Sequence, residues 1–363
     1  MFCIFWCAQH RSRLKIEGLW KKTLIRDSYG LLIRSDTKTI MSIEGTRTVA
    51  IEKQGSKTAT NVNLLLRCWQ YLYLRTPNFR GKGQIFFNKP CELIRNWPVD
   101  VSIPGAHGCT FFHCDLNEYI YRFLFFYGLH ELDVDWICSQ VLQPGDVFID
   151  IGACFGYHTL SGALRVGPAG RVYALEPQPD MFARLQDNLS GNNLSTVTAD
   201  LLALSDHAET LHLHRFADLG IGHTSISPQG REVSQIISAA AMTLDAYAEQ
   251  RAIKNVNLVK LDVEGAELKV LRGATALLAG ASPPMWIVEI NEETAAACGY
   301  HPRDLLALLA PYGYVFYRPV WGRMIRTVMR LESCSANDIR NGMNLLCAIP
   351  AFHADRLANV GVA

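Results

Sequence analysis

The feature that most constrains the fold is a regular alternation of strand-like and helix-like segments between residues 146 and 350. Short runs rich in valine, isoleucine and aromatic residues are predicted strands, and most are followed by a longer amphipathic segment. The expected strands are 146–152, 171–177, 195–204, 257–265, 284–290, 314–318 and 344–350, and the expected helices are 157–166, 180–192, 266–280 and 302–313. The segment 209–216 alternates apolar and polar residues, which predicts an antiparallel strand that partly faces solvent. This alternation predicts a Rossmann-like α/β fold whose mostly parallel sheet is covered on both faces. The last two strands, joined by a non-helical stretch, are expected to form an antiparallel edge.

Length and composition divide the chain into regions. The 363 residues are 49% hydrophobic, which suffices for one large domain or for one domain with an appendage. Residues 1–60 carry 11 Lys and Arg against 5 Asp and Glu and show no sustained periodicity, so we expect a disordered basic tail or a mis-assigned start. The expected regions after it are an N-terminal α/β cap at 61–142, the main α/β domain at 143–350 and a C-terminal tail at 351–363. Within the cap the patterns predict a helix at 61–75, a strand at 83–89 and two helices that meet near Gly128.

Charge and apolar patterning exclude two classes of partner. The formal net charge is +1, so no general attraction to nucleic acid or to an anionic membrane is expected. Apolar runs such as 119–129 are interrupted and too short to cross a bilayer. The 11 cysteines are odd in number and lie mostly within apolar runs, which is typical of free thiols in a reducing compartment. A soluble cytoplasmic protein is therefore expected.

The stretch DVFIDIGACFGYHTL places a carboxylate and two glycines at the end of the first core strand. Asp150, Gly152 and Gly156 should lie beyond the carboxyl end of the sheet, where ligands bind in open α/β folds. The spacing is G-x-x-x-G, unlike a dinucleotide fingerprint, and no lysine follows as in a phosphate loop. A carboxylate in this place favours a cationic or amino-bearing ligand, and S-adenosylmethionine carries both a sulfonium and an amino group.

A second carboxylate ends the next strand, in the sequence YALEP. Glu176 follows Gly152 by 24 residues. An acidic residue at about this distance accepts hydrogen bonds from ribose hydroxyls in nucleotide-binding folds. The two motifs on adjacent strands predict a site for a nucleoside cofactor.

Further carboxylates cluster in VKLDVEGAE and in the strand WIVEI. Asp262 and Glu264 should end a core strand, Glu267 should begin the next helix, and Glu289 ends the following strand. A buried carboxylate beside a cofactor can act as a general base, and several together can bind a divalent cation. Helix capping is the alternative, above all for Glu267. The residues alone do not separate a base from a metal ligand.

Several histidines and cysteines are weaker candidates. His158 follows the glycine loop and is a possible catalytic residue, although packing on the helix face is the favoured interpretation. His223 lies in a glycine-rich segment that could cover the site as a mobile lid. His107, Cys109, His113 and Cys114 invite comparison with a zinc site, but no second ligand pair follows, so packing is favoured there too.

Taken in order and spacing, VFIDIGACFGYHTL, GRVYALEPQPDMFARLQDNL, ALSD, VKLDVEGAELKVLRGA and WIVEI resemble the FkbM family of S-adenosylmethionine-dependent methyltransferases. The resemblance implies the class I methyltransferase fold, a seven-stranded sheet with one antiparallel strand. It also implies methyl transfer to a hydroxyl of a small molecule, such as a glycoside or polyketide. By position, Asp150, Gly152, Ala153 and Gly156 would form the loop on the methionine side, and Glu176 with Pro177 would hold the ribose. Cys154 departs from the asparagine that is common at that place.

The resulting hypothesis is an S-adenosylmethionine-dependent O-methyltransferase. Asp262 or Glu264 is the expected base, with His158 as a third catalytic candidate. One alternative is an oxidoreductase with a nucleotide cofactor, which the missing G-x-G-x-x-G motif disfavours. The other is a protein that binds S-adenosylmethionine and has lost catalysis, for which Cys154 is the one hint.

Overall fold

A computed structural model describes residues 100–105, 107–216, 219–220, 222–320 and 330–360, together with parts of 25–43 and 66–76. The chain divides into two compact units, Met1–Ile51 and Glu52–Ala363. In the first unit the described residues form a small antiparallel sheet of β1 (Ile25–Arg26), β2 (Leu31–Ile33) and β3 (Met41–Ile43). The predicted tail at 1–60 otherwise lies outside the described residues, and it stays a prediction, as do the boundaries of the cap and the main domain.

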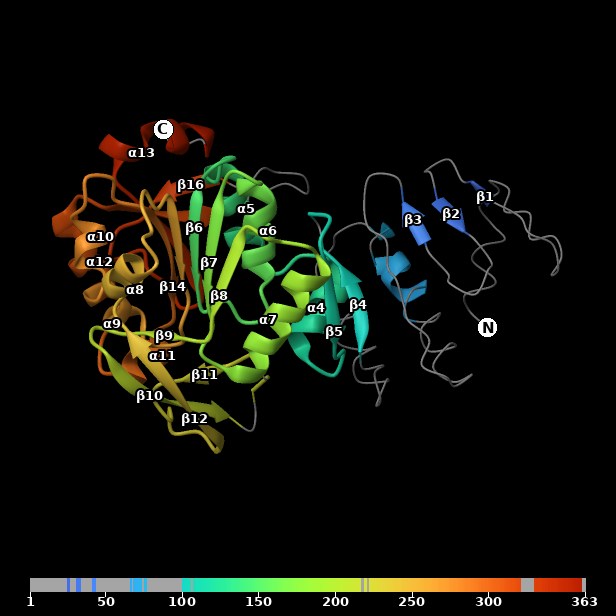
Figure 1. The fold of residues 1–363 in the computed structure, drawn as a ribbon, viewed down its shortest axis with the longest axis horizontal. Coiled ribbons are helices and arrows are strands. Elements are labelled where there is room, and N and C mark those ends of the chain that lie inside the picture. Colours follow the sequence, from blue (N-terminus) through green and yellow to red (C-terminus); the bar gives the residue numbers. More distant parts are fainter. Residues whose placement is uncertain are drawn as a thin grey trace. The chain divides into compact units, whose positions relative to one another are not determined.

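The second unit is built on an eight-stranded mixed sheet (Figure 1). Its strand order is β16-β15-β17-β14-β13-β6-β7-β8. The strands are β6 (Val147–Ile151), β7 (Arg171–Leu175), β8 (Val197–Asp200), β13 (Leu258–Leu261), β14 (Met285–Ile290), β15 (Val315–Val320), β16 (Arg330–Ser333) and β17 (Met343–Ala348).

The α/β class and the large mixed sheet are confirmed, but two details of the prediction were wrong. The sheet has eight strands rather than seven, because β16 pairs antiparallel with β15 at the edge. The antiparallel strand next to the parallel ones is β17, which lies inside the sheet between β14 and β15. Its last four residues, LLCA, are apolar and buried, as a strand covered on both faces requires.

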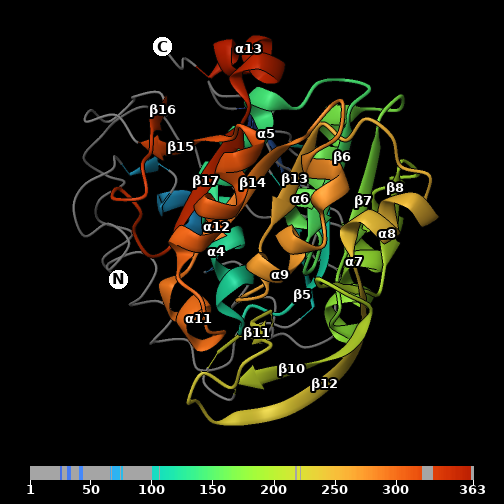
Figure 2. The ribbon, with the colours of Figure 1, turned by 90° about the vertical axis from the view of Figure 1, so that its left-hand side faces the viewer.

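Helices cover both faces of this sheet. In Figure 1, α8, α9 and α12 lie on its left and α5, α6 and α7 on its right, and in Figure 2 α9 and α12 lie in front of it. They are α5 (Leu132–Val141), α6 (Tyr157–Val166), α7 (Pro179–Gly191), α8 (Leu244–Gln250), α9 (Glu267–Arg272), α10 (Thr275–Leu278), α11 (Glu292–Ala297), α12 (Pro302–Leu309) and α13 (Pro350–Asn359), with a 3₁₀ turn at Ala310–Tyr312. Alternate residues of β6 point to opposite cores: Ile149 packs in the core with α8, α9 and α12, and Phe148 in the core with α5 and α6.

A second, four-stranded sheet has the order β11-β10-β12-β9. Its strands are β9 (Ala203–Leu204), β10 (Glu209–Phe216), β11 (Thr224–Ser225) and β12 (Val233–Met242). The antiparallel strand predicted at 209–216 is confirmed as β10. Its long partner β12 was not predicted, because the alanines and serines of VSQIISAAAM give only a weak alternation.

The cap begins with helical residues within 66–75, which agrees with the predicted helix. Next come an unpredicted strand β4 (Val101–Pro104), its antiparallel partner β5 (Thr110–Cys114), and helix α4 (Tyr119–Tyr127). Helix α4 ends at Gly128, whose φ of 69° allows the chain to turn into α5, so the two predicted helices are confirmed. The strand predicted at 83–89 lies outside the described residues.

The predicted C-terminal tail contains a helix, α13, which is a correction. Pro350 lies in its first turn, where a missing N–H group has no cost, and Leu357 is buried in the same core as α5. Arg356 donates to Asp146 Oδ1 at 2.8 Å, which ties this helix to the start of β6. The sequence pattern did not indicate the helix because Phe352 and Leu357 are its only large apolar residues and the other apolar ones are alanines.

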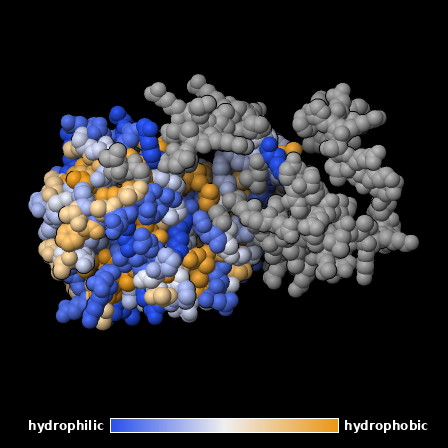
Figure 3. All heavy atoms as spheres, turned by 90° about the horizontal axis from the view of Figure 1, so that it is seen from above, coloured by the Kyte–Doolittle hydropathy of each residue, from blue (hydrophilic) through white to orange (hydrophobic). Residues whose placement is uncertain are grey.

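Polar and apolar residues are interspersed over the coloured surface in Figure 3. Among the described residues, no helix is long and apolar enough to cross a membrane.

Candidate active site

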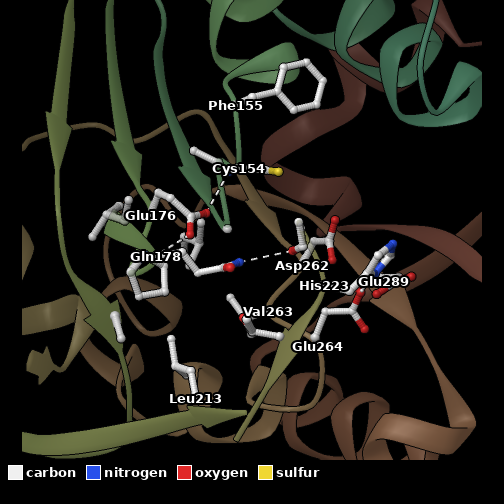
Figure 4. A pocket seen from close by; sticks show the side chains of 18 of the residues that line it. Cys154, Phe155, Glu176, Gln178, Leu213, His223, Asp262, Val263, Glu264 and Glu289 are labelled. Carbon is white, nitrogen blue, oxygen red and sulfur yellow. Dashed lines mark hydrogen bonds and ion pairs between the residues drawn. The ribbon is translucent and has the colours of Figure 1, made fainter. Parts of the chain in front are cut away.

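A cavity of about 330 Å³ opens at the carboxyl ends of β6, β7, β13 and β14. Its volume is within the range of small-molecule sites. Among the predicted site residues, Gly152, Ala153, His158, Glu176, Pro177, Asp262 and Glu264 line it, and so do His223 and Glu289. Figure 4 shows Glu176 and Gln178 on one side of this cavity, and Asp262, Glu264, His223 and Glu289 together on the other. Asp150, Gly156 and Glu267 are not part of the lining.

The loop after β6 requires glycine at its first turn. Gly152 has a φ of 80°, and a Cβ atom there would lie 1.8 Å from the backbone oxygen of Asp262. Cys154 also has a positive φ, at 51°. Asparagine tolerates this conformation better than most residues, which explains why the resemblance predicts asparagine there. With cysteine at position 154, the backbone still adopts the left-handed conformation at this place in the loop.

Two of the residues predicted to bind the cofactor, Asp150 and Gly156, do not line the cavity. Asp150 is only 1% exposed, and its Oδ2 accepts a hydrogen bond of 2.5 Å from Thr159 on α6. Gly156 begins α6 with a φ of 93°, and an added Cβ would meet Leu185 at 2.5 Å. The sequence analysis placed Asp150 correctly near the carboxyl end of β6, but it did not predict that the side chain faces Thr159.

Glu176 is fixed at the wall of the cavity by the backbone. Its Oε2 accepts from the Cys154 N–H and its Oε1 from the Gln178 N–H, each at 2.8 Å. Burial raises the pKa of this carboxyl to about 7, although the two N–H donors act in the opposite direction. Each oxygen has a further lone pair that can accept from a ligand hydroxyl.

This raised pKa predicts a pH-dependent stability. A carboxyl that is harder to ionise in the folded state stabilises the fold below its unfolded pKa and loses that contribution as pH rises through about 7. Relative to Glu176→Gln, wild type should lose up to about 3 kcal/mol of unfolding free energy between pH 5 and pH 8. Urea unfolding of both proteins at each pH measures this difference, and parallel pH profiles would contradict the assignment.

A buried lysine that the sequence analysis missed lies beneath the site. Lys260 is 3% exposed, and its Nζ donates to Asp262 Oδ2 at 2.8 Å and lies 4.0 Å from Asp150 Oδ1. Lys260 and Asp150 are register partners on β13 and β6. Burial alone would lower the pKa of the lysine, but Asp262 and Asp150 raise it above its ordinary value. A lysine amid the apolar strand NLVKLDV was the available signal.

The other predicted bases also have protein partners. Glu264 Oε1 pairs with His223 Nδ1 at 2.9 Å, and this hydrogen bond raises the pKa of the histidine. His158 Nε2 lies 2.6 Å from Glu131 Oε2. Burial would raise the pKa of Glu131, but His158 and His130 lower it below its ordinary value. Glu131 was not predicted, because no periodic pattern marks a residue in a short helix–helix connection.

Glu267 caps the loop before α9, as the alternative interpretation proposed. It accepts hydrogen bonds from the Val263 and Gly265 N–H groups at 3.0–3.1 Å and from the Tyr300 hydroxyl at 2.6 Å. Burial raises its pKa. Its role is therefore to hold the loop that carries Asp262 and Glu264.

Among the described residues, possible metal-ligand atoms lie close together in one cluster only, formed by Asp206, His207 and Glu209 at the surface. Asp262, Glu264 and Glu289 do not converge in this way. The histidines of the disfavoured zinc cluster are engaged elsewhere: His107 with Asp135 at 2.9 Å, and His113 with Asp100. Cys109 and Cys114 are buried in an apolar core, in keeping with the packing interpretation.

Comparison with known proteins decides the family. The methyltransferase FkbM domain matches residues 150–316. The hexuronic acid methyltransferase AglP of Haloferax volcanii is 31% identical over 180 residues, a match that covers 50% of this chain and 68% of that protein. The chain belongs to the FkbM methyltransferase family. It is an S-adenosylmethionine-dependent methyltransferase, and the alternative of an oxidoreductase was wrong.

Two further proteins that are similar to this FkbM methyltransferase carry the family name. The 31-O-demethyl-FK506 methyltransferase FkbM of Streptomyces tacrolimicus is 27% identical over 199 residues, covering 46% of this chain and 73% of that protein. The crystal structure of methyltransferase FkbM from Methylobacillus flagellatus aligns with 14% identity and a TM-score of 0.35, covering 80% of this chain and 60% of that one. The matched domain runs from Asp150 into β15 and contains the motifs that the resemblance rested on, apart from the first three residues of VFIDIGACFGYHTL.

Proposed function

We propose that this enzyme transfers a methyl group from S-adenosylmethionine to a hydroxyl oxygen of a small molecule, such as a glycoside or polyketide. The names of two relatives support this proposal, since one is a methyltransferase of a hexuronic acid and the other of 31-O-demethyl-FK506. The mixed lining of the cavity is compatible with such an acceptor, because it combines aliphatic side chains such as Leu211, Leu213 and Ile226 with several carboxylates. Nucleic acid and membrane are not among the proposed partners.

The observation that carries the cofactor assignment is the position of Glu176. Its two oxygens are held by backbone N–H groups at the cavity wall, so the carboxylate is pre-organised to accept from both hydroxyls of a ribose. Pro177 lines the wall beside it, and Gly152 and Ala153 line the neighbouring strand end. The chain at Gly152 passes close to the backbone of Asp262, since an added Cβ there would collide with it. Gly152 also lines the cavity, so the loop leaves room for a ligand above it.

In this proposal the residues of the enzyme bind the cofactor, orient the acceptor and exchange a proton with it. The bound cofactor supplies a methyl group activated by the positive sulfonium. Asp262, Glu264 and His158 line the part of the cavity beyond the glycine loop, where they can position the acceptor hydroxyl by hydrogen bonds. Each already has a charged or titratable partner, namely Lys260, His223 and Glu131. A divalent cation and a cytoplasmic location stay predictions from the sequence.

Titration calorimetry with S-adenosylmethionine tests the cofactor site. Wild type should bind it, and Glu176→Gln should bind about 10- to 100-fold more weakly, because hydrogen bonds to a charged acceptor contribute about 1.5–3 kcal/mol. Asp187→Asn makes a similar change of charge on an exposed face of α7 and should leave the affinity unchanged. A folded wild type that does not bind, or equal affinity in Glu176→Gln, would contradict the proposed site.

A further inference from the structure

One carboxyl group in the cavity, that of Glu289, has no hydrogen-bond partner in the part of the chain that the structure describes. Glu289 is the penultimate residue of β14, the strand next to β13, and lines the cavity. Its Oε2 is buried and has no hydrogen-bond partner among the described residues. Asp262 and Glu264, by contrast, accept bonds of 2.8 and 2.9 Å from Lys260 and His223. Figure 4 shows Glu289 beside His223, Asp262 and Glu264.

The strand order places Glu289 at the reacting end of the proposed cofactor. If the ribose is held at Glu176 on β7, the rest of the molecule extends along the carboxyl edge past the loop after β6 toward β13. The next strand in that direction is β14. The sulfonium and the acceptor hydroxyl would therefore meet between the loop and the end of β14, where the free carboxyl oxygen is.

We propose that Glu289 is the general base of the methyl transfer, an inference that rests on the proposed function. The acceptor O–H bond breaks and its proton passes to the Glu289 carboxylate. The hydroxyl oxygen forms the new bond to the methyl carbon, and the electron pair of the broken carbon–sulfur bond stays on sulfur. The products are a methyl ether, a neutral thioether and a protonated Glu289. Solvent takes up this proton when the site opens.

The surroundings of Glu289 explain how this base is regulated. Burial raises its pKa well above the ordinary value, and nearby carboxylates raise it further. The carboxylates concerned are Asp262, Glu264 and Glu267 from the β13–α9 segment and Glu131 from the connection before α5. Two other titratable groups lie nearby: Tyr300, which precedes α12, and His223, which pairs with Glu264. Asn344 on β17 is the neutral register partner of Glu289. In the free protein these surroundings therefore favour the protonated form of the carboxyl. A cation bound beside it favours the ionised form, so loading with the cofactor prepares the base.

The test needs no acceptor, because binding of a sulfonium should release the proton of Glu289. Titration calorimetry near pH 7 in buffers of different ionisation enthalpy counts the protons released. The quantity compared is the release by S-adenosylmethionine minus that by S-adenosylhomocysteine, which lacks the positive charge. This difference should be larger in wild type than in Glu289→Gln, by up to one proton. Glu289→Asp keeps a carboxyl and should retain part of it, and exposed Glu293→Gln should match wild type.

The outcomes separate the two proposals. Absence of binding in folded wild type would contradict the proposed function itself. Binding by wild type and Glu289→Gln with the same difference in proton release would overturn the assignment of Glu289 alone. If Glu289→Gln fails to fold, wild type still decides the matter, because equal proton release by the two ligands would mean that no carboxyl senses the sulfonium.

Discussion

Gly152→Ala should destabilise the fold and disrupt cofactor binding. The added Cβ would lie 1.8 Å from the Asp262 backbone oxygen, and no rotamer change can relieve contact with a backbone atom. Left-handed strain of about 1–2 kcal/mol adds to overpacking of about 1–3 kcal/mol, so we expect a loss of about 2–5 kcal/mol in unfolding free energy. The ends of β6 and β13 must separate, which also displaces Asp262 and weakens binding of S-adenosylmethionine at least about tenfold.

Gly145→Ala separates strain from collision. Gly145 has a φ of 93°, yet a Cβ there would meet nothing within 4 Å. It should therefore cost only the strain, about 1–2 kcal/mol, and leave cofactor affinity unchanged. Urea unfolding followed by circular dichroism and a calorimetric titration would compare both variants with wild type. Equal losses in the two variants would show that the close approach of the loop to Asp262 does not matter.

The order of the core elements was predictable because hydrophobic periodicity is strong there. Helix α6 spans the residues expected from the pattern, and Glu176 and Asp262 directly follow β7 and β13, the two parallel strands on either side of β6. Burial on both faces makes such strands nearly continuous apolar runs, which are easily recognised. Weakly patterned elements were missed, namely β12 and α13, since their stability comes from tertiary contacts rather than from their own periodicity.

The direction of side chains at the site was less predictable. Asp150 was expected to face the ligand, but the strand pleat turns it toward Thr159 and Lys260. A shift of one residue reverses the face that a side chain occupies, so the position at a strand end does not determine what it contacts. Partners that come from distant segments, such as Glu131 for His158 and His223 for Glu264, depend on the complete fold.

Lys260→Met should cost about 3–5 kcal/mol, the loss typical when one partner of a buried ion pair is removed. Methionine fills most of the space of the lysine stem but leaves Asp150 and Asp262 without their cation. Lys269→Met is the matched control. Lys269 pairs with Glu209 at 2.9 Å, but both side chains are partly exposed, so the loss there should be at most about 1 kcal/mol.

A second substitution tests the electrostatic origin of the Lys260→Met defect. Without the cation, Asp150 and Asp262 lose their charged partner, so adding Asp262→Asn should reverse part of the defect because one unpaired charge is removed. Urea unfolding of the single and the double variant measures this difference. A double variant that is no more stable than Lys260→Met would instead mean that the lysine acts by packing. Since Lys260 holds Asp262 and itself lines the cavity, an electrostatic defect would also show that a buried cation sets the charge balance beside the proposed cofactor.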